Sequence, residues 1–272
     1  MDAWLTAYKI PFGKWMKVII DFVQTWFGDA IELSTKSLKF LIEGLSWLLV
    51  KPSALVMILG LTAFTWWLHR KIGLTLYALV ALLLIANLGY WDATMETVSL
   101  VGVATLVSVV IGVPIGIAAA HRPWFYNVLR PILDLMQTLP TFVYLIPTLV
   151  LFGLGVVPGM ISTVIFAIPA PIRLTQLGVA SVPTPLKEAG LAFGATRRQL
   201  LWKVELPYAL PMIMTGINQC IMLSLSMVVI AALVGAGGLG KPVVRALNTV
   251  NIPMGFEAGL AIVLLAILLD RV

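Results

Sequence analysis

Residues 181–207 read SVPTPLKEAGLAFGATRRQLLWKVELP, a polar stretch in a chain that otherwise carries little charge. Pro183 and Pro185 end whatever precedes them, and Thr184 is a suitable cap for a following helix. Gly194 breaks that helix, and Thr196 can start a second short one. Apolar positions recur at helical spacing on both sides of Gly194: Leu186, Ala189, Gly190 and Phe193, then Leu200, Leu201 and Val204. This spacing predicts two short amphipathic helices that form a knob, with an apolar face and basic rims for another protein.

The composition around this stretch indicates a membrane protein. Of the 272 residues, 60% are hydrophobic and 11% are charged, whereas a soluble domain carries about 25% charged residues. A chain so poor in charge cannot cover a water-facing surface, so we expect lipid to surround it. The excess of six positive charges then indicates basic cytoplasmic loops and not a nucleic-acid partner.

Uncharged runs predict an all-α polytopic membrane protein with about seven transmembrane helices. The runs cover residues 52–68, 72–91, 97–120, two spans within 135–172, 207–234 and 257–269. The fourth run is too long for one helix, and the glycines and proline of residues 153–159 are expected to break it. The last run is short unless residues 253–256 join it.

The N-terminal segment, residues 1–51, has a different pattern, because charges are scattered through its apolar stretches at 15–28 and 31–50. Amphipathic helices of this kind lie in the membrane interface, or the segment forms one weak span. We therefore expect three parts: the amphipathic segment 1–51, a hairpin of two spans at 52–96, and a core domain at 97–272 that contains the cytoplasmic loop 181–207.

Basic turns predict the orientation of the chain. The turns 69–71, 121–130 and 173–203 are separated from one another by two predicted spans each, so all three lie on one side of the membrane. The positive-inside rule assigns that side to the cytoplasm. The N-terminus is then outside and the C-terminus cytoplasmic. Basic residues between Lys9 and Lys51, and Lys241 with Arg245, disagree with this orientation, but the charge in 173–203 is denser.

The 181–207 stretch resembles the cytoplasmic motif of permease subunits of binding-protein-dependent ABC importers. That motif reads Glu-Ala-Ala, three residues, Gly, nine residues, Ile, one residue, Leu-Pro. This chain matches it at every interval, with Gly190 in place of the second Ala and Val204 in place of Ile. The resemblance implies the type I importer permease fold and an ATPase-coupling loop that comprises Glu188, Ala189, Gly190, Gly194, Arg197, Arg198, Leu206 and Pro207.

Other runs are similar to the branch that imports quaternary ammonium compatible solutes such as glycine betaine, proline betaine, carnitine and choline. They are Leu139-Pro140-Thr141, residues 235–240 and residues 268–271. The resemblance implies a non-enzymatic permease of the bacterial inner membrane that works by alternating access. It also implies two ATP-binding subunits that hold ATP and Mg, a second permease copy and an extracytoplasmic binding protein, with no cofactor on this chain.

Motifs for chemistry are missing from the sequence or stand in the wrong context. Cys220 is the only cysteine, and the two histidines are far apart, which excludes a zinc constellation. No G-x-x-x-x-G-K-[ST] sequence occurs. The glycines of residues 235–240 spell G-x-G-x-x-G, but they follow an apolar helix instead of a strand. We expect a tight extracytoplasmic turn there and no nucleotide.

Polar residues inside the predicted spans are candidates for the solute path, because each is unfavourable in lipid. They are Gln137, Thr138, Tyr144, Asn218, Gln219, Ser224 and Ser226. Hydrogen bonding between helices is the alternative role for each of them. An ion-gradient-driven secondary transporter is the alternative function, but it normally needs intramembrane charges, and predicted spans three to six contain none.

Overall fold

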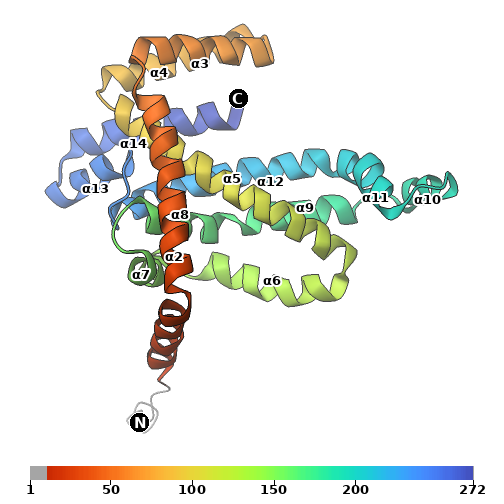
Figure 1. The fold of residues 1–272 in the computed structure, drawn as a ribbon. Helices are drawn as coiled ribbons and strands as arrows, with labels where there is room; N and C mark the ends of the chain where they lie inside the picture. The colour runs from red at the N-terminus through yellow and green to blue at the C-terminus, as the bar shows by residue number, and fades with distance from the viewer. Residues whose placement is uncertain (1–10, 272) are drawn as a thin grey trace, which may run out of the picture.

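The structure is a computed structural model that describes residues 11–271. Lys9 and the rest of the first ten residues of the predicted amphipathic segment, together with Val272, lie outside the described residues. The described part is helical throughout, which confirms the all-α prediction (Figure 1). In chain order its elements are α2 Phe12–Val50, α3 Ala54–His69, α4 Ile72–Asn87, α5 Trp91–His121, α6 Pro123–Thr138, α7 Thr141–Phe152, α8 Val156–Ala167, α9 Pro169–Ala180, α10 Thr184–Ala192, α11 Arg197–Leu200, the π-helix η1 Leu201–Glu205, α12 Leu206–Ala232, α13 Gly240–Thr249 and α14 Ile252–Arg271.

The centre of the bundle consists of α5, α8, α9 and α12, which pack side by side. Small residues of α5 and α12 lie directly against α9: Gly116 faces Thr175 and the carbonyl of Ile172, and Gly216 faces Pro171. Membrane helices associate through such close packing, because lipid provides little hydrophobic drive for helices to meet. The core domain therefore has a closely packed centre of four helices, and the loops connect to their ends.

Each predicted apolar run is helical, but the helices differ in length. Four segments between residues 11 and 271 are long and apolar enough to cross a membrane: α5, Val156–Ala180, Arg197–Ala232 and α14. Two bent pairs, α2 with α3 and α6 with α7, raise the number to six, and α4 is a shorter apolar helix. The 16 residues of α3 and of α4 are fewer than the roughly 20 that span a bilayer.

Two breaks divide the long uncharged run. The expected break is confirmed, since α7 ends at Phe152 and α8 begins at Val156. A second break lies at Leu139–Pro140, where α6 and α7 meet at 97°. Leu139 is extended, with ψ of 136°, as the residue before a proline usually is. The first predicted span of this run is therefore a bent pair, and most of the expected turn 121–130 belongs to α6.

The start of the basic turn predicted at 173–203 was wrong, because α9 continues to Ala180. The predicted cytoplasmic loop 181–207 begins directly after this helix. The Arg173 guanidinium donates a hydrogen bond to Asp134 Oδ1 of α6 at 2.6 Å, and this ion pair allows a charged residue to remain in the helix. The apolar segment Val156–Ala180 therefore extends past the predicted bound at residue 172 and includes one charged residue.

The helix α2 is continuous, where the sequence suggested two stretches. It meets α3 at 98° and crosses in front of the bundle in Figure 1. Ile42 is its buried anchor and packs against Val103, Ala104 and Met160. Its charges remain exposed, as in the Glu32–Lys36 pair at 2.7 Å. The crossing direction agrees with an interfacial helix, while the three-part domain division stays a prediction.

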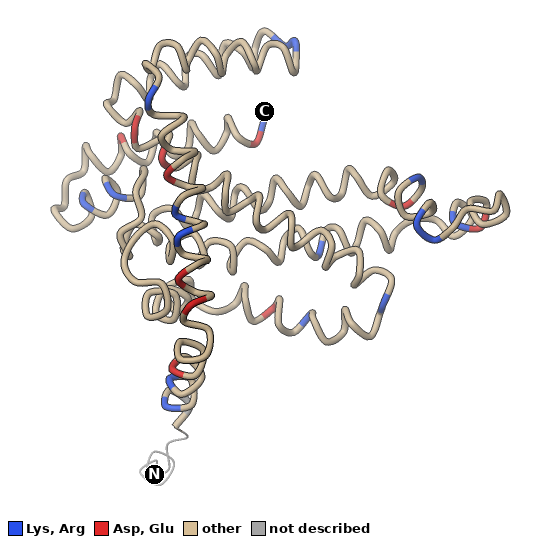
Figure 2. The backbone as a smooth tube through the Cα atoms, viewed as in Figure 1, with Lys and Arg blue, Asp and Glu red and all other residues tan. Residues whose placement is uncertain are grey.

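The basic turns collect at one end of the bundle. The α3–α4 turn, the α5–α6 turn and the α10–α11 knob all lie toward the right in Figures 1 and 2. The basic residues of α13 lie at the opposite end, as Figure 2 shows. This arrangement agrees with the predicted alternation of the turns. Which side of the membrane each end faces stays a prediction.

Candidate functional site

The knob of residues 181–207 begins with α10, which a glycine ends. Gly194 has φ of +76°, and the turn has the Schellman hydrogen bonds, Gly194 N–H to Leu191 O at 2.9 Å and Ala195 N–H to Gly190 O at 3.1 Å. A left-handed residue at this position favours glycine. The predicted break between two short helices at Gly194 is confirmed.

A capping box starts the second short helix. Thr196 Oγ1 accepts a hydrogen bond from the backbone N–H of Gln199 at 3.3 Å, and Gln199 Oε1 accepts one from the Thr196 N–H at 2.8 Å. Two otherwise unpaired N–H groups are satisfied in this way, which fixes where the helix begins. The predicted start at Thr196 is therefore confirmed.

The face of α10 that packs on the second helix of the knob leaves little space for side chains. A Cβ at Gly190 would lie 2.8 Å from Leu200 Cδ1 and 3.7 Å from Val204 Cγ2, so α10 packs closely on the second helix. The predicted face is only partly correct, because Phe193 follows the last turn of α10 and points outward with 93% of its surface exposed.

The outer face of the knob is apolar with charged neighbours. Exposed apolar side chains are Leu186, Leu191, Phe193 and Trp202, and the exposed charged side chains are Glu188, Arg197, Arg198 and Lys203. Large exposed apolar groups rimmed by polar residues mark protein interaction sites. Outside lipid, such a face suits docking of a soluble subunit.

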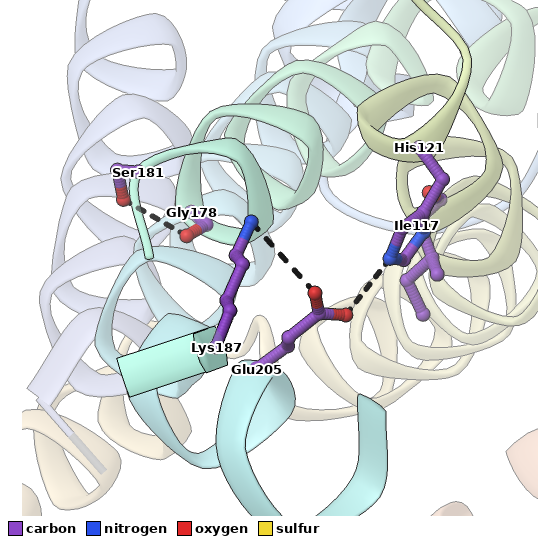
Figure 3. Close-up of polar contacts among 6 residues, drawn as sticks. All are labelled: Ile117, His121, Gly178, Ser181, Lys187 and Glu205. Atoms are coloured by element: carbon purple, nitrogen blue, oxygen red, sulfur yellow. Dashed lines mark hydrogen bonds and ion pairs between the residues drawn. The ribbon is translucent and has the colours of Figure 1, made fainter. Parts of the chain in front are cut away.

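One buried carboxylate, which the sequence analysis overlooked, lies at the base of the knob (Figure 3). Glu205 has 3% of its surface exposed. Its Oε2 lies 2.8 Å from His121 Nε2 at the end of α5, and its Oε1 lies 3.7 Å from Lys187 Nζ of α10. The other ring nitrogen of His121, Nδ1, lies 2.9 Å from the Ile117 carbonyl. Because carbonyl and carboxylate oxygens accept hydrogen bonds, the ring donates to both when both nitrogens carry hydrogen.

A sequence signal for this cluster existed. Glu205 directly precedes the uncharged run 206–240, and His121 directly follows the uncharged run 97–120. A buried acid requires partners of opposite charge, so a basic residue at the end of another run, such as His121, was the residue to test. Their sequence separation of 84 residues concealed the contact.

The candidate path residues do not share one cavity in the single chain. Asn218, Gln219 and Ser226 are exposed on one face of α12, whereas Ser224 is fully buried on another face. Gln137 is half-buried and Thr138 exposed at the end of α6.

Tyr144 has a structural partner within the chain. It is buried in α7, and its hydroxyl donates to the carbonyls of Leu135 and Met136. The hydroxyl therefore satisfies the Met136 carbonyl, whose partner four residues on would be Pro140, a residue without an N–H. The Leu135 carbonyl also accepts the Leu139 N–H at 3.1 Å.

The residue 235–240 turn packs closely against the start of α5. The backbone N–H of Gly238 donates to Glu96 Oε2 at 2.7 Å, and that of Leu239 donates to Thr97 Oγ1 at 2.9 Å. A methyl group on Gly240 would overlap the Val228 carbonyl. The predicted tight turn is confirmed, and the side chains that hold it were not predicted. No group of three or more potential metal ligands occurs in the described part of the chain.

Known proteins share this architecture. The chain is 45% identical over 265 residues to the glycine betaine transport system permease protein OpuAB of Bacillus subtilis, covering 97% of this chain and 93% of that protein. It is 43% identical over 265 residues to the glycine betaine/carnitine transport permease protein GbuB of Listeria monocytogenes, covering 96% and 94%. A chain of the MetNI methionine ABC transporter, solved in inward facing conformations, superposes with a TM-score of 0.58 at 25% identity, covering 64% of this chain and 88% of that one.

Residues 112–272, which include the knob and the central helices, match the family described as binding-protein-dependent transport system inner membrane component. This segment covers more than half of the chain, and the two permeases above are similar along nearly all of it. The chain therefore belongs to the family of binding-protein-dependent transport system inner membrane components.

Proposed function

We propose that this chain translocates quaternary ammonium compatible solutes, of the glycine betaine, carnitine and choline type, as the permease subunit of an ATP-driven importer. The near full-length similarity to OpuAB and GbuB, whose names describe transport of glycine betaine and carnitine, carries this proposal. As an inner-membrane component of a transport system the chain is not an enzyme. Hydrolysis of ATP, with Mg, belongs to separate subunits.

The outer face of the knob supports a docking role. Its exposed Leu186, Leu191, Phe193 and Trp202 lie at the end of the bundle that carries the basic turns, the end assigned to the cytoplasm. One knob per chain serves one ATP-binding subunit, so the working unit contains two permeases and two ATP-binding subunits. An extracytoplasmic binding protein then delivers solute at the opposite end, with the N-terminus outside and the C-terminus in the cytoplasm.

The polar face of α12 supports a solute path between two copies. A quaternary ammonium cation cannot lose its charge by proton loss, so the path must offer partial charges from amides, hydroxyls and ring faces. Asn218 and Gln219 provide exposed amides. Transport by alternating access requires only weak contacts along this path, with tight selection left to the binding protein.

Uptake by the reconstituted complex tests the proposal. The permease, its ATP-binding subunit and its binding protein are placed in vesicles, and uptake of labelled glycine betaine, carnitine and choline is compared with uptake of methionine, a solute without a quaternary nitrogen. We expect ATP-dependent uptake of a quaternary amine that ionophores do not abolish. Uptake of methionine alone would overturn the substrate class. Uptake that ionophores abolish and that persists without ATP would favour the ion-gradient alternative.

A further inference from the structure

Three separate elements meet at the Glu205 carboxylate. Its two oxygens point in different directions, Oε2 toward His121 of α5 and Oε1 toward Lys187 of α10 (Figure 3). Glu205 itself is the last residue of the π-helix and directly precedes α12. The Glu205 side chain therefore connects three elements: α10 of the knob, the start of α12 and the end of α5.

The apolar residues near Glu205 explain why its carboxylate requires close polar partners. Val179, Ala209 and Ile213 form an apolar cluster contributed by α9 and α12. Leu206, which directly follows Glu205, and Ile117, whose carbonyl contacts the His121 ring, both pack against this cluster. A charge beside such a cluster is unfavourable without close partners. Releasing either partner would leave Glu205 short of compensation, so the three elements are expected to move together.

The backbone at this point is also unusual. The five residues of η1 form a π-helix between α11 and α12, and π-turns inside helices are frequently found at functional sites. A π-turn takes up an additional residue, which changes the direction in which the following side chain points. This geometry turns Glu205 inward toward α5, while Trp202 of the same turn is exposed.

The covalent path leaves α5 without a connection to the knob. Within the knob, residues 181–183 follow α9 directly and η1 leads directly into α12, but α5 ends at His121 and the chain continues into α6. Among the described residues, the contact of His121 Nε2 with Glu205 Oε2 is the side-chain hydrogen bond between α5 and the knob. Its removal would leave the knob attached to α9 and α12 only.

We propose that Glu205 is a positioning residue that, with His121 and Lys187, forms a clasp through which motion of the docked knob reaches α5. This inference rests on the proposed function, because it needs an ATP-binding subunit that moves the knob. When the two ATP-binding subunits close on each other, α10 and the start of α12 move together. The contacts of the clasp make the end of α5 move with them. Without the clasp, ATP is hydrolysed but the spans respond less.

The test measures solute transported per ATP hydrolysed in the reconstituted complex. Glu205→Gln and His121→Gln each remove one ionisable partner of this contact, and His121→Lys places a cation at that position. Glu32→Gln is the matched control, since Glu32 is also paired with a basic side chain but is exposed on α2. Copurification of the ATP-binding subunit with each variant reports docking.

We expect Glu205→Gln and His121→Gln each to lower the transport-to-hydrolysis ratio about tenfold, while docking stays intact. The double variant should be no worse than the poorer single variant, because both changes break one contact, and His121→Lys should restore most of the ratio. Should Glu205→Gln fail to assemble, His121→Gln, which alters a half-exposed side chain, decides the question alone.

Two outcomes separate the inference from the proposed function. If the unaltered complex transports no quaternary amine, the proposed function fails. If the unaltered complex transports one, and His121→Gln keeps a normal ratio or lowers uptake and hydrolysis in parallel, the clasp is refuted and the proposed function stands.

Discussion

Replacing Gly194 isolates the effect of one backbone angle on docking. Its φ of +76° lies in the left-handed region, and an added Cβ would meet nothing within 4 Å. Alanine therefore adds no clash, and only the backbone preference changes, by roughly 1–2 kcal/mol for a non-glycine residue. Such a penalty lowers the population of the docking-ready knob roughly 5–30-fold. Asparagine adopts the left-handed region more readily than most residues, so its effect should be smaller.

Affinity of the purified permease for its ATP-binding subunit measures this effect, because apparent affinity falls in proportion to the competent population. We expect Gly194→Ala to weaken binding within that range and Gly194→Asn to weaken it less. Gly60→Ala is the control, since Gly60 also has open space around it but lies inside α3 without a positive φ. Unchanged binding by Gly194→Ala would show that the knob docks in another conformation or that the docking face lies elsewhere.

Three further predictions concern the path, the glycine turn and the assembly. Asn218→Trp should slow uptake without changing solute affinity of the binding protein alone; a normal uptake rate would place Asn218 against lipid or a neighbouring helix. Gly240→Val should lower the melting temperature of the purified permease, because its side chain overlaps the Val228 carbonyl, whereas Gly259→Val has open space and should not; equal melting temperatures would contradict the packing of this turn. Native mass measurement should find two permeases with two ATP-binding subunits, and a complex with one permease would contradict the assembly.

Local signals predicted the helices well. Charge-free runs located the apolar helices, and Gly194 and Thr196 marked the turn and the cap of the knob because their effects depend on neighbouring residues alone. The Leu139–Pro140 break carried an equally local signal that we did not use. The amphipathic helix α13 was also missed, because its ten residues directly follow the glycine turn and contain too few turns for a clear period.

Long-range contacts were not predictable from local patterns. The sequence predicted a turn that starts at Arg173, because no residue near Arg173 in the sequence indicates its partner Asp134, 39 residues earlier. His121 and Glu205 pair across 84 residues, and Glu96 supports the glycine turn across 142. Each of these contacts provides a partner for a charged side chain that lies at the edge of an apolar run, where local patterns indicate none. A charged residue next to an apolar run is therefore a reason to search for a distant partner.

The polar side chains of α12 differ in what the single chain provides for them. Thr215 and Ser226 donate to carbonyls of their own helix, at 2.9 and 3.0 Å, so lipid is tolerable for both hydroxyls. The amides of Asn218 and Gln219 make no hydrogen bond to any residue between 11 and 271 and are exposed. An unsatisfied polar group in hydrocarbon is unfavourable by several kcal/mol, so this face requires water, solute or a second copy. This requirement singles out the two amides among the candidate path residues, and it is the physical reason for our proposal that the solute path runs along this face of α12.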